Sequence, residues 1–407
     1  MNDRGMRLRQ ATVLEFRGPA TLAGHTTAVS LHAHTNRSNE GMANVSRYLE
    51  RIPLVAPLVR RQLRVYLRRN GESVDFKKGW WHPPVDPQTV LASETSQIRQ
   101  ALGLRPVVSI TDHDSIDAGL ELQRQHSHAL VPLSFEWTVP FHQGFFHLGV
   151  HNLRSESATR LFQALSAYTH APDAARLAGL LEALNSDRET LVVLNHPLWD
   201  LAGIGSADHV ALLRRFLVDH GDMIHGLELN GYRSSRENRG VRTLAEAYAL
   251  PLISGGDRHG CAPNALLNVT TATSFGEFAR EIRERRQSVI LVMPQYRTSL
   301  VARKLTSAAD TMREYPFYPP GQQRWTDRVS YERHGTVRSL SVAWPRGGPL
   351  WVRAAVRAFQ LGASAPLLPL LRTTVWLAGA ATPDRASPAS LVEPASQLRP
   401  GCSEIST

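Results

Sequence analysis

Histidines and carboxylates recur in this sequence where runs of β-branched and apolar residues end. Residues 29–35 carry two histidines, His32 and His34, separated by one residue. Side chains at positions i and i+2 of a strand point to the same face, so both imidazoles are expected to converge on one point. That geometry chelates metal ions. The alternative is an ordinary strand, because imidazoles also lie at strand ends for packing or hydrogen bonding.

The rest of the chain favours the metal. Ligand-type side chains accompany most other predicted strands: Asp112, His113 and Asp114 follow 105–111, Glu136 lies late in 129–138, His147 lies in 145–150, His196 follows 190–195, Glu228 lies in 224–230, and Asp257 and His259 follow 252–255. In parallel α/β architectures the carboxyl ends of the strands converge on one face. Each residue alone would more often be structural, but their recurrence predicts one polynuclear metal site.

Helices are expected between these strands. Apolar residues at helical spacing predict helices at 87–102, 158–168, 174–184, 207–218, 238–249 and 275–285, and further strands are expected at 267–272 and 288–293. This repeated alternation predicts a parallel sheet, either open or closed into a barrel.

Residues 40–84 interrupt the alternation and are predicted to be an insertion. Residues 51–69 place apolar side chains at helical spacing and fill the remaining positions with arginine, which indicates a basic amphipathic helix. Its arginines could simply be solvated, or the helix could be a lid or a surface for phosphate or acidic lipid. The insertion starts beside His34 and ends near Trp80 and Trp81, and we therefore predict a lid over the site.

The C-terminal third does not continue the pattern. Residues 296–380 contain short amphipathic pieces broken by glycine and proline, and they form an extension of unknown role. Residues 381–407 are poor in apolar side chains and are predicted to be disordered.

Composition and charge limit the possible partners and the cellular compartment of the protein. The net charge is +10 over 407 residues, and 14 basic against 7 acidic residues follow from Arg297 onwards. This surplus of positive charge could bind nucleic acid, a membrane surface or an anionic substrate. The abundance of Arg, Ala and Leu also indicates a compositional bias. Two distant cysteines predict a reducing compartment and a metal held by nitrogen and oxygen. Without a predicted leader or spanning segment, we expect a cytoplasmic protein. The oligomeric state does not follow from the sequence.

The motifs resemble, in order, those of the PHP (polymerase and histidinol phosphatase) superfamily of metal-dependent phosphoesterases. The matching elements are His32-x-His34-Thr, Thr-Asp112-His113-Asp114, Phe-Glu136, His147-Leu-Gly, Asn-His196-Pro, Leu-Glu228 and Gly-Gly-Asp257-x-His259. The resemblance covers residues 25–295. It implies a distorted (β/α)7 TIM-like barrel with two to three divalent ions at its carboxyl face, and the donor types suit Zn, Mn or Fe.

The resemblance also implies three ligand sets. One ion would take His32, His34, Glu136 and Asp257, a second would take Glu136, His147 and His196, and a third would take His113, His259 and the position of Asn39, where the family commonly has aspartate. Asn39 offers only a neutral oxygen, so Glu40 is the alternative ligand. Glu228 is expected to orient a ligand. Arg258 and Arg233 are expected to hold the substrate phosphate or, alternatively, to form salt bridges at the rim.

The function implied is hydrolysis of a phosphate ester on a small phosphorylated metabolite or nucleotide. Glu136 and Asp257 would hold ions about 3.5–4 Å apart, which make a bound water acidic enough to attack phosphorus as hydroxide. Alternatives are a nuclease or 3'-5' phosphodiesterase acting on nucleic acid, an amidohydrolase, and a non-catalytic binding protein of the same fold.

Overall fold

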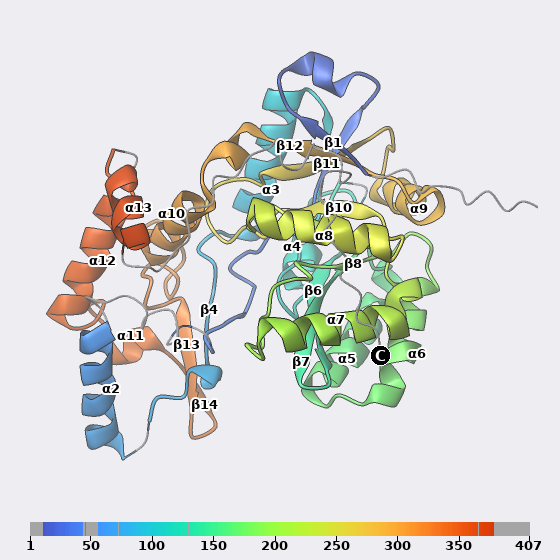
Figure 1. Ribbon diagram of the computed structural model, residues 1–407. Helices are drawn as coiled ribbons and strands as arrows, with labels where there is room; N and C mark the ends of the chain where they lie inside the picture. Colours follow the sequence, from blue (N-terminus) through green and yellow to red (C-terminus); the bar gives the residue numbers. More distant parts are fainter. Residues whose placement is uncertain are drawn as a thin grey trace, which may run out of the picture.

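The computed structural model describes residues 11–43, 45, 56–71, 73–128, 130–364 and 366–377. Over these residues the chain is a mixed α/β protein with several sheets and helices, as Figure 1 shows. The predicted tail, 381–407, lies outside the described residues, as does part of the predicted insertion. No helix in the described part of the chain is long and apolar enough to cross a membrane.

Two five-stranded sheets form the main body. The first has the order β1-β12-β11-β2-β5, with β1 at Thr12–Glu15, β12 at Val289–Val292, β11 at Leu266–Thr270, β2 at Thr27–Ser30 and β5 at Arg105–Val108. The second has the order β10-β9-β8-β7-β6, with β10 at Leu252–Gly255, β9 at Gly226–Asn230, β8 at Leu191–Leu194, β7 at Gly144–His151 and β6 at Phe135–Phe141.

The sheets are mixed, so the prediction of an all-parallel sheet is wrong. β11 runs antiparallel to β12 and β2, and β7 runs antiparallel to β6 and β8. A parallel neighbour needs a long crossover, whereas β6 and β7 are joined by a tight turn in which His142 has a φ of 50°. The other pairs, including β2 with β5 and β8 with β9, are parallel.

The two sheets meet at two isolated bridges, Ala33 with Arg258 and His113 with Glu136. Among the described residues the strand ladders do not close into a barrel. Both bridges lie beside predicted metal ligands, and the junction between the sheets is therefore where the site is built.

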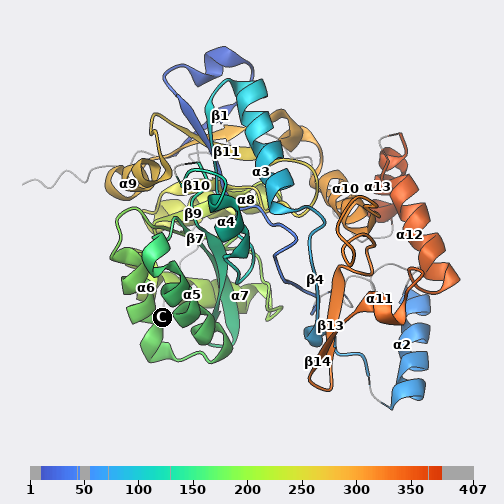
Figure 2. The ribbon, with the colours of Figure 1, turned by 180° about the vertical axis from the view of Figure 1, so that it is seen from behind.

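Helices cover these sheets, as Figure 2 shows, and apolar side chains on these helices are buried. They are α3 at Pro87–Ser96, α4 at Asp117–Gln123, α5 at Ser155–His170, α6 at Ala174–Asn185, α7 at Ser206–His220, α8 at Ser235–Ala247 and α9 at Phe275–Arg285. α9 illustrates the cause: the Ser274 side chain accepts from the Glu277 N–H and starts the helix. Phe275, Phe278 and Ile282 then recur at helical spacing and are buried.

The insertion and the C-terminal extension share a third sheet. Its order is β14-β13-β4-β3, with β14 at Thr336–Ser339, β13 at Val329–Arg333, β4 at Gly79–Trp81 and β3 at Glu40–Gly41. We call this sheet the accessory unit, together with α2 at Ala56–Asn70, α10 at Leu300–Met312, α11 at Leu340–Ala343, α12 at Leu350–Gly362 and α13 at Leu368–Leu377. The insertion and the extension, which were predicted as separate segments, are thus paired.

Within the accessory unit, α2 lies at the outer edge, away from the main body (Figures 1 and 2). The short strands β3 and β4 instead lead back to the predicted ligands. The lid function stays a prediction. Among the described residues of the insertion, Glu40 of β3 and Trp81 of β4 lie beside predicted ligands.

Candidate metal centre

Three predicted ligands follow strand ends in an unusual backbone conformation. His32, His196 and Asp257 have φ values of 62°, 27° and 54°. Non-glycine residues rarely adopt this region, which costs on the order of 1–3 kcal/mol each and persists where surrounding structure enforces it. Here the carbonyl of His32 accepts from the Asp257 N–H at 2.7 Å, which ties two of these turns together.

His32 and His34 converge, but not by strand alternation. β2 ends at Ser30, before either histidine. The left-handed turn at His32 redirects the chain, and the two ring centroids lie 5.0 Å apart. The expected convergence is found, although its cause is a turn.

Glu136 lies at the centre of the cluster and is fully buried. Its two carboxylate oxygens lie near five imidazoles: His32 Nε2 at 3.1 Å, His34 Nε2 at 3.4 Å, His113 Nδ1 at 3.3 Å, His147 Nδ1 at 3.3 Å and His196 Nε2 at 3.2 Å. Asn195 Nδ2 donates to Glu136 Oε1 at 2.9 Å and holds the carboxylate in place.

Two more carboxylates flank this centre. Asp257 Oδ1 lies 3.7 Å from His32 Nε2, 3.6 Å from His34 Nε2 and 3.6 Å from His259 Nδ1. Glu40 Oε2 lies 3.3 Å from His113 Nε2 and 3.2 Å from His259 Nε2. The three carboxylates therefore share the histidines between them.

Glu40, not Asn39, enters the cluster. Asn39 is exposed, whereas Glu40 is buried and its Oε1 accepts from Ser38 Oγ at 2.6 Å. The cause is β3, which begins at Glu40 and pairs this residue with Trp81 of β4. The assignment of Asn39 as a ligand is corrected in favour of the alternative, Glu40.

Other buried carboxylates orient the cluster. Glu228 Oε1 lies 2.5 Å from His32 Nδ1, and its Oε2 accepts from the His196 N–H at 2.7 Å. Asp112 accepts from the N–H and hydroxyl of Thr35 at 2.6 and 2.7 Å, which fixes the chain just after His34. Burial raises the pKa of Asp112 to about 7, against the Thr35 hydrogen bonds.

The carboxylates of the cluster remain negative. Burial alone would raise the pKa of Glu136, but His32, His113 and His147 outweigh it and hold that pKa well below its usual range. The pKa of Glu40 is likewise lowered, against burial, by His113 and His259. Because a buried negative charge is costly unless compensated, this cluster needs cations.

The histidines divide into two groups. Burial lowers the pKa of His34 and of His147 to about 4, so both imidazoles are neutral and keep a free lone pair at neutral pH. The pKa of His113 is instead raised to about 10, because Glu40 and Glu136 outweigh its burial. Protons on only some of the imidazoles thus compensate the carboxylates.

The donor set fits divalent metal ions. Among the described residues, His34 Nε2 and His147 Nδ1 are buried without a hydrogen-bond partner. Three groups have ligand atoms within 4.8 Å of one another: His34, Glu40, His113 and His259; His32, His34 and Glu136; and His113, Glu136 and His147. Imidazole nitrogens with carboxylate oxygens suit Zn, Mn or Fe. The number and identity of the ions stay predictions, as do the individual ligand sets.

The two predicted phosphate-binding arginines lie in different surroundings. Arg258 is buried, and it donates to Glu94 Oε1 and Ser93 Oγ at 2.7 Å and to the carbonyls of Gly260 and Cys261 at 3.0 Å. These bonds occupy both terminal nitrogens of the guanidinium with the protein itself, while its buried Nε has no hydrogen-bond partner among the described residues. The catalytic assignment of Arg258 is therefore corrected to the salt-bridge alternative.

Arg233 faces the cluster. Its Nη2 lies 3.4 Å from Asp257 Oδ2, and its guanidinium carbon lies 3.3 Å from the ring centroid of Trp199. Its buried Nε has no hydrogen-bond partner among the described residues. A stacked guanidinium with a free donor beside the ligands can hold an anionic oxygen.

Lys304 of α10 was not among the predicted site residues. Lys304 is exposed, yet desolvation by the surrounding protein and then repulsion from Arg233 lower its pKa to about 8. Attraction from Asp257 opposes this shift, so Lys304 lies within electrostatic range of the cluster. Nothing local in the sequence distinguishes this lysine, because α10 belongs to the C-terminal extension.

Comparisons with known proteins leave the family open. No protein-family model and no curated protein matches the sequence. An amidohydrolase from Chromobacterium violaceum is 14% identical, with a TM-score of 0.28 over 44% of this chain and 83% of that chain. A candidate metal-dependent phosphoesterase from Bifidobacterium adolescentis is 17% identical, with a TM-score of 0.29 over 49% of this chain and 91% of that chain. Similarity this low carries no argument about function.

Proposed function

We propose that this protein is a metal-dependent phosphoesterase of the PHP type, acting on a small phosphorylated metabolite or nucleotide. One observation carries the proposal: five imidazoles surround the buried Glu136, and two of them keep unpartnered ring nitrogens. Such a donor set binds metal ions, and the cationic side chains beside it favour a substrate with negative oxygens.

The ions would be held by the histidines and by Glu136, Asp257 and Glu40. When bound, divalent ions supply an acidified water as nucleophile and neutralise the charge of a phosphoryl group. Glu40 would complete the third set with His113 and His259, whose nitrogens lie 3.3 and 3.2 Å from Glu40 Oε2.

The remaining residues have separate tasks. Glu228 holds Nδ1 of His32, which leaves Nε2 aimed at the centre. Arg233, stacked on Trp199, offers its Nε to a phosphate oxygen. Lys304 supplies a second positive charge from the accessory unit, as a flexible point charge that can follow substrates of different size.

The barrel of the PHP type also belongs to this proposal. In it, β2, β5 and the second sheet would form a distorted seven-stranded ring, joined at the bridges of Ala33 with Arg258 and His113 with Glu136. Each bridge joins a single pair of residues, so the proposed ring is interrupted at these two points.

The proposal is tested by elemental analysis together with a hydrolysis screen. We expect two or three equivalents of Zn, Mn or Fe, loss of activity with a chelator, and cleavage of p-nitrophenyl phosphate or sugar phosphates. Bis(p-nitrophenyl) phosphate and oligonucleotides detect a diesterase, and anilide substrates detect an amidohydrolase. A metal-loaded protein that cleaves only anilides contradicts the phosphoesterase, and a protein without metal contradicts the whole assignment.

A further inference from the structure

The accessory unit carries long stretches without acidic residues. α2 contains five arginines and no Asp or Glu, and residues 333–377 contain six arginines and no Asp or Glu. No ion pair within the described part of the chain involves Arg60, Arg64, Arg353 or Arg357. Positive charge therefore accumulates on these two stretches, where these four arginines have no ion pair among the described residues.

The exposed face of α12 combines this charge with apolar side chains. Leu350, Arg353, Arg357 and Leu361 are all exposed and follow one another at helical spacing on one side of the helix. Leu350 is 79% exposed and Leu361 is 65% exposed. A helix of a water-soluble surface would normally place such leucines inward, so this stripe is suited to a partner.

Neighbouring helices extend the same pattern. Leu370 of α13 is 67% exposed, and α2 exposes Leu67 together with Arg60, Arg61 and Arg64. Figures 1 and 2 show α2, α12 and α13 along the edge of the molecule opposite α5 and α6. We call the exposed residues of these three helices the basic edge.

We propose that the basic edge docks on a membrane surface rich in anionic phospholipid. Arginines without acidic neighbours attract the negative headgroups. The interspersed leucines enter the boundary between headgroups and acyl chains, as in helices that lie in the membrane interface. Nucleic acid would use the same charge but gives the exposed leucines no apolar partner. The metal cluster takes no part in this contact, so the proposal stands apart from the proposed function.

The test is sedimentation of the full chain with vesicles of phosphatidylcholine, with and without 30% phosphatidylserine. We expect binding to the anionic vesicles at 0.1 M salt, little binding to neutral vesicles, and weaker binding at 0.5 M salt. The double substitution Arg353→Glu with Arg357→Glu should weaken binding at least ten-fold. Leu350→Ser with Leu361→Ser should weaken it while leaving the net charge unchanged.

A matched control changes the same charge elsewhere. Arg160 and Arg176 are exposed on α5 and α6, on the far side of the molecule. Arg160→Glu with Arg176→Glu should retain vesicle binding, and an unchanged circular dichroism spectrum and thermal midpoint show that each variant is folded. Equal loss in this control and in the Arg353, Arg357 variant overturns the proposal.

Two other occupants are distinguished by the same samples. A wild-type chain that binds duplex oligonucleotides but no vesicles overturns the proposal in favour of nucleic acid. A wild-type chain that binds no vesicles but forms a dimer, lost in the Leu350, Leu361 variant, overturns it in favour of a second copy of the chain.

Discussion

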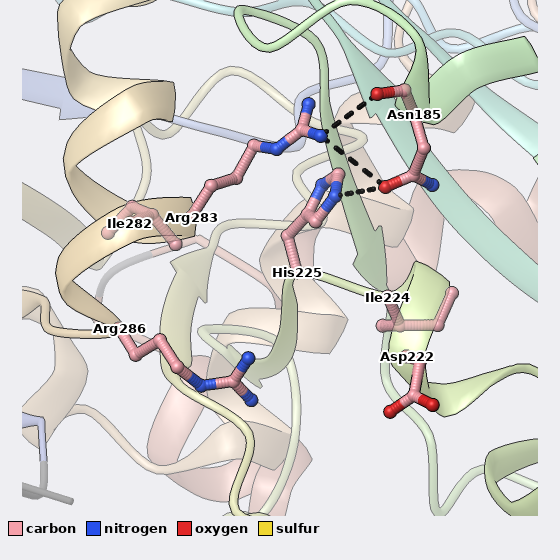
Figure 3. Close-up of a pocket in the computed structure, with 7 residues that line it drawn as sticks. All are labelled: Asn185, Asp222, Ile224, His225, Ile282, Arg283 and Arg286. Atoms are coloured by element: carbon pink, nitrogen blue, oxygen red, sulfur yellow. Dashed lines mark hydrogen bonds between the residues drawn. The ribbon is translucent and has the colours of Figure 1, made fainter. Parts of the chain in front are cut away.

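Buried histidines at the two ends of the second sheet differ in whether their ring nitrogens have hydrogen-bond partners. At the amino end, His225 precedes β9, where its Nδ1 accepts from the Val192 N–H and its Nε2 donates to Asn185 Oδ1, both at 2.8 Å. Figure 3 shows this region, a cavity of about 190 Å³ that Arg283 and Arg286 also line. At the carboxyl end, the imidazoles of His34 and His147 face carboxylates and keep unpartnered nitrogens.

The difference separates a structural histidine from a ligand. His225 has both ring nitrogens satisfied by the protein, so it needs nothing further. Around Glu136, by contrast, His34 Nε2 and His147 Nδ1 have no partner among the described residues, and a cation between them and the carboxylates would supply one. Burial and residue type are the same at both ends, and the hydrogen-bond inventory is what distinguishes them.

The largest expected effect is at Glu136. Glu136→Gln removes the central anionic ligand while keeping its size, and it should reduce the metal content and lower kcat about 10²-fold or more. Elemental analysis and the hydrolysis assay measure both. Glu182→Gln, on the exposed side of α6, is the control and should change neither. Full metal content in Glu136→Gln would contradict the role of Glu136 as a ligand, and with it the contrast between this cluster and His225.

Arg233 and Arg258 should respond in different ways. Arg258→Ala leaves Glu94 buried without its cation, which should lower the free energy of unfolding by about 3–5 kcal/mol. Arg233→Ala should instead raise KM for a phosphoester about 10- to 100-fold, because a charge-assisted hydrogen bond to substrate is lost. Thermal unfolding and steady-state kinetics on both variants separate the effects. Equal increases in KM for both variants would indicate that Arg258 also binds the substrate.

Glu40 and Asn39 form a matched pair of neighbours. Glu40→Gln should remove about one metal ion per chain, because the carboxylate beside His113 and His259 is lost. Asn39→Ala should leave the metal count unchanged, since Asn39 is exposed. If Asn39→Asp raises the metal count while Glu40→Gln does not lower it, position 39 and not Glu40 is the ligand position.

The smallest effect concerns pH and His225. Burial, followed by repulsion from Arg283 and Arg286, lowers the pKa of His225 to about 3. The folded state therefore keeps His225 neutral, whereas the unfolded chain takes up a proton below about pH 6.5. The contribution of His225 to the free energy of unfolding is therefore highest above pH 6.5 and decreases as the pH falls towards 3. At pH 5 the decrease is about 2 kcal/mol. Urea unfolding at pH 7 and pH 5 should show a smaller loss in His225→Gln than in the wild type. An equal loss in both chains would mean that His225 is protonated in the folded state.

Local patterns in the sequence predicted the elements that depend on neighbours in the chain. The helix expected at 275–285 is α9, which begins at Phe275 and ends at Arg285, because its serine cap and its apolar spacing are local. The gathering of His32, Glu136 and Asp257 was also predicted, since ligand-type residues followed successive strands. The mixed direction of the strands was not, because hydrophobic alternation is the same in parallel and antiparallel pairs.

Long-range pairing accounts for the rest. Glu40 enters the cluster because β3 pairs with β4, and β4 in turn pairs with β13 near the other end of the chain. The choice between Asn39 and Glu40 depends on that register. Arg258 was misassigned because its partner, Glu94, comes from α3, far away in the sequence.

The pairing of β4 with β13 also orders events during synthesis. Trp81 pairs with Val329, so β4 leaves the ribosome long before its partner strand exists. Until then Glu40 is held beside the histidines only by the short β3–β4 pairing and by the Ser38 hydroxyl. We therefore expect the nascent chain to assemble the His32 and Glu136 part of the centre first, and to gain its full complement of ligands only once β13 has emerged.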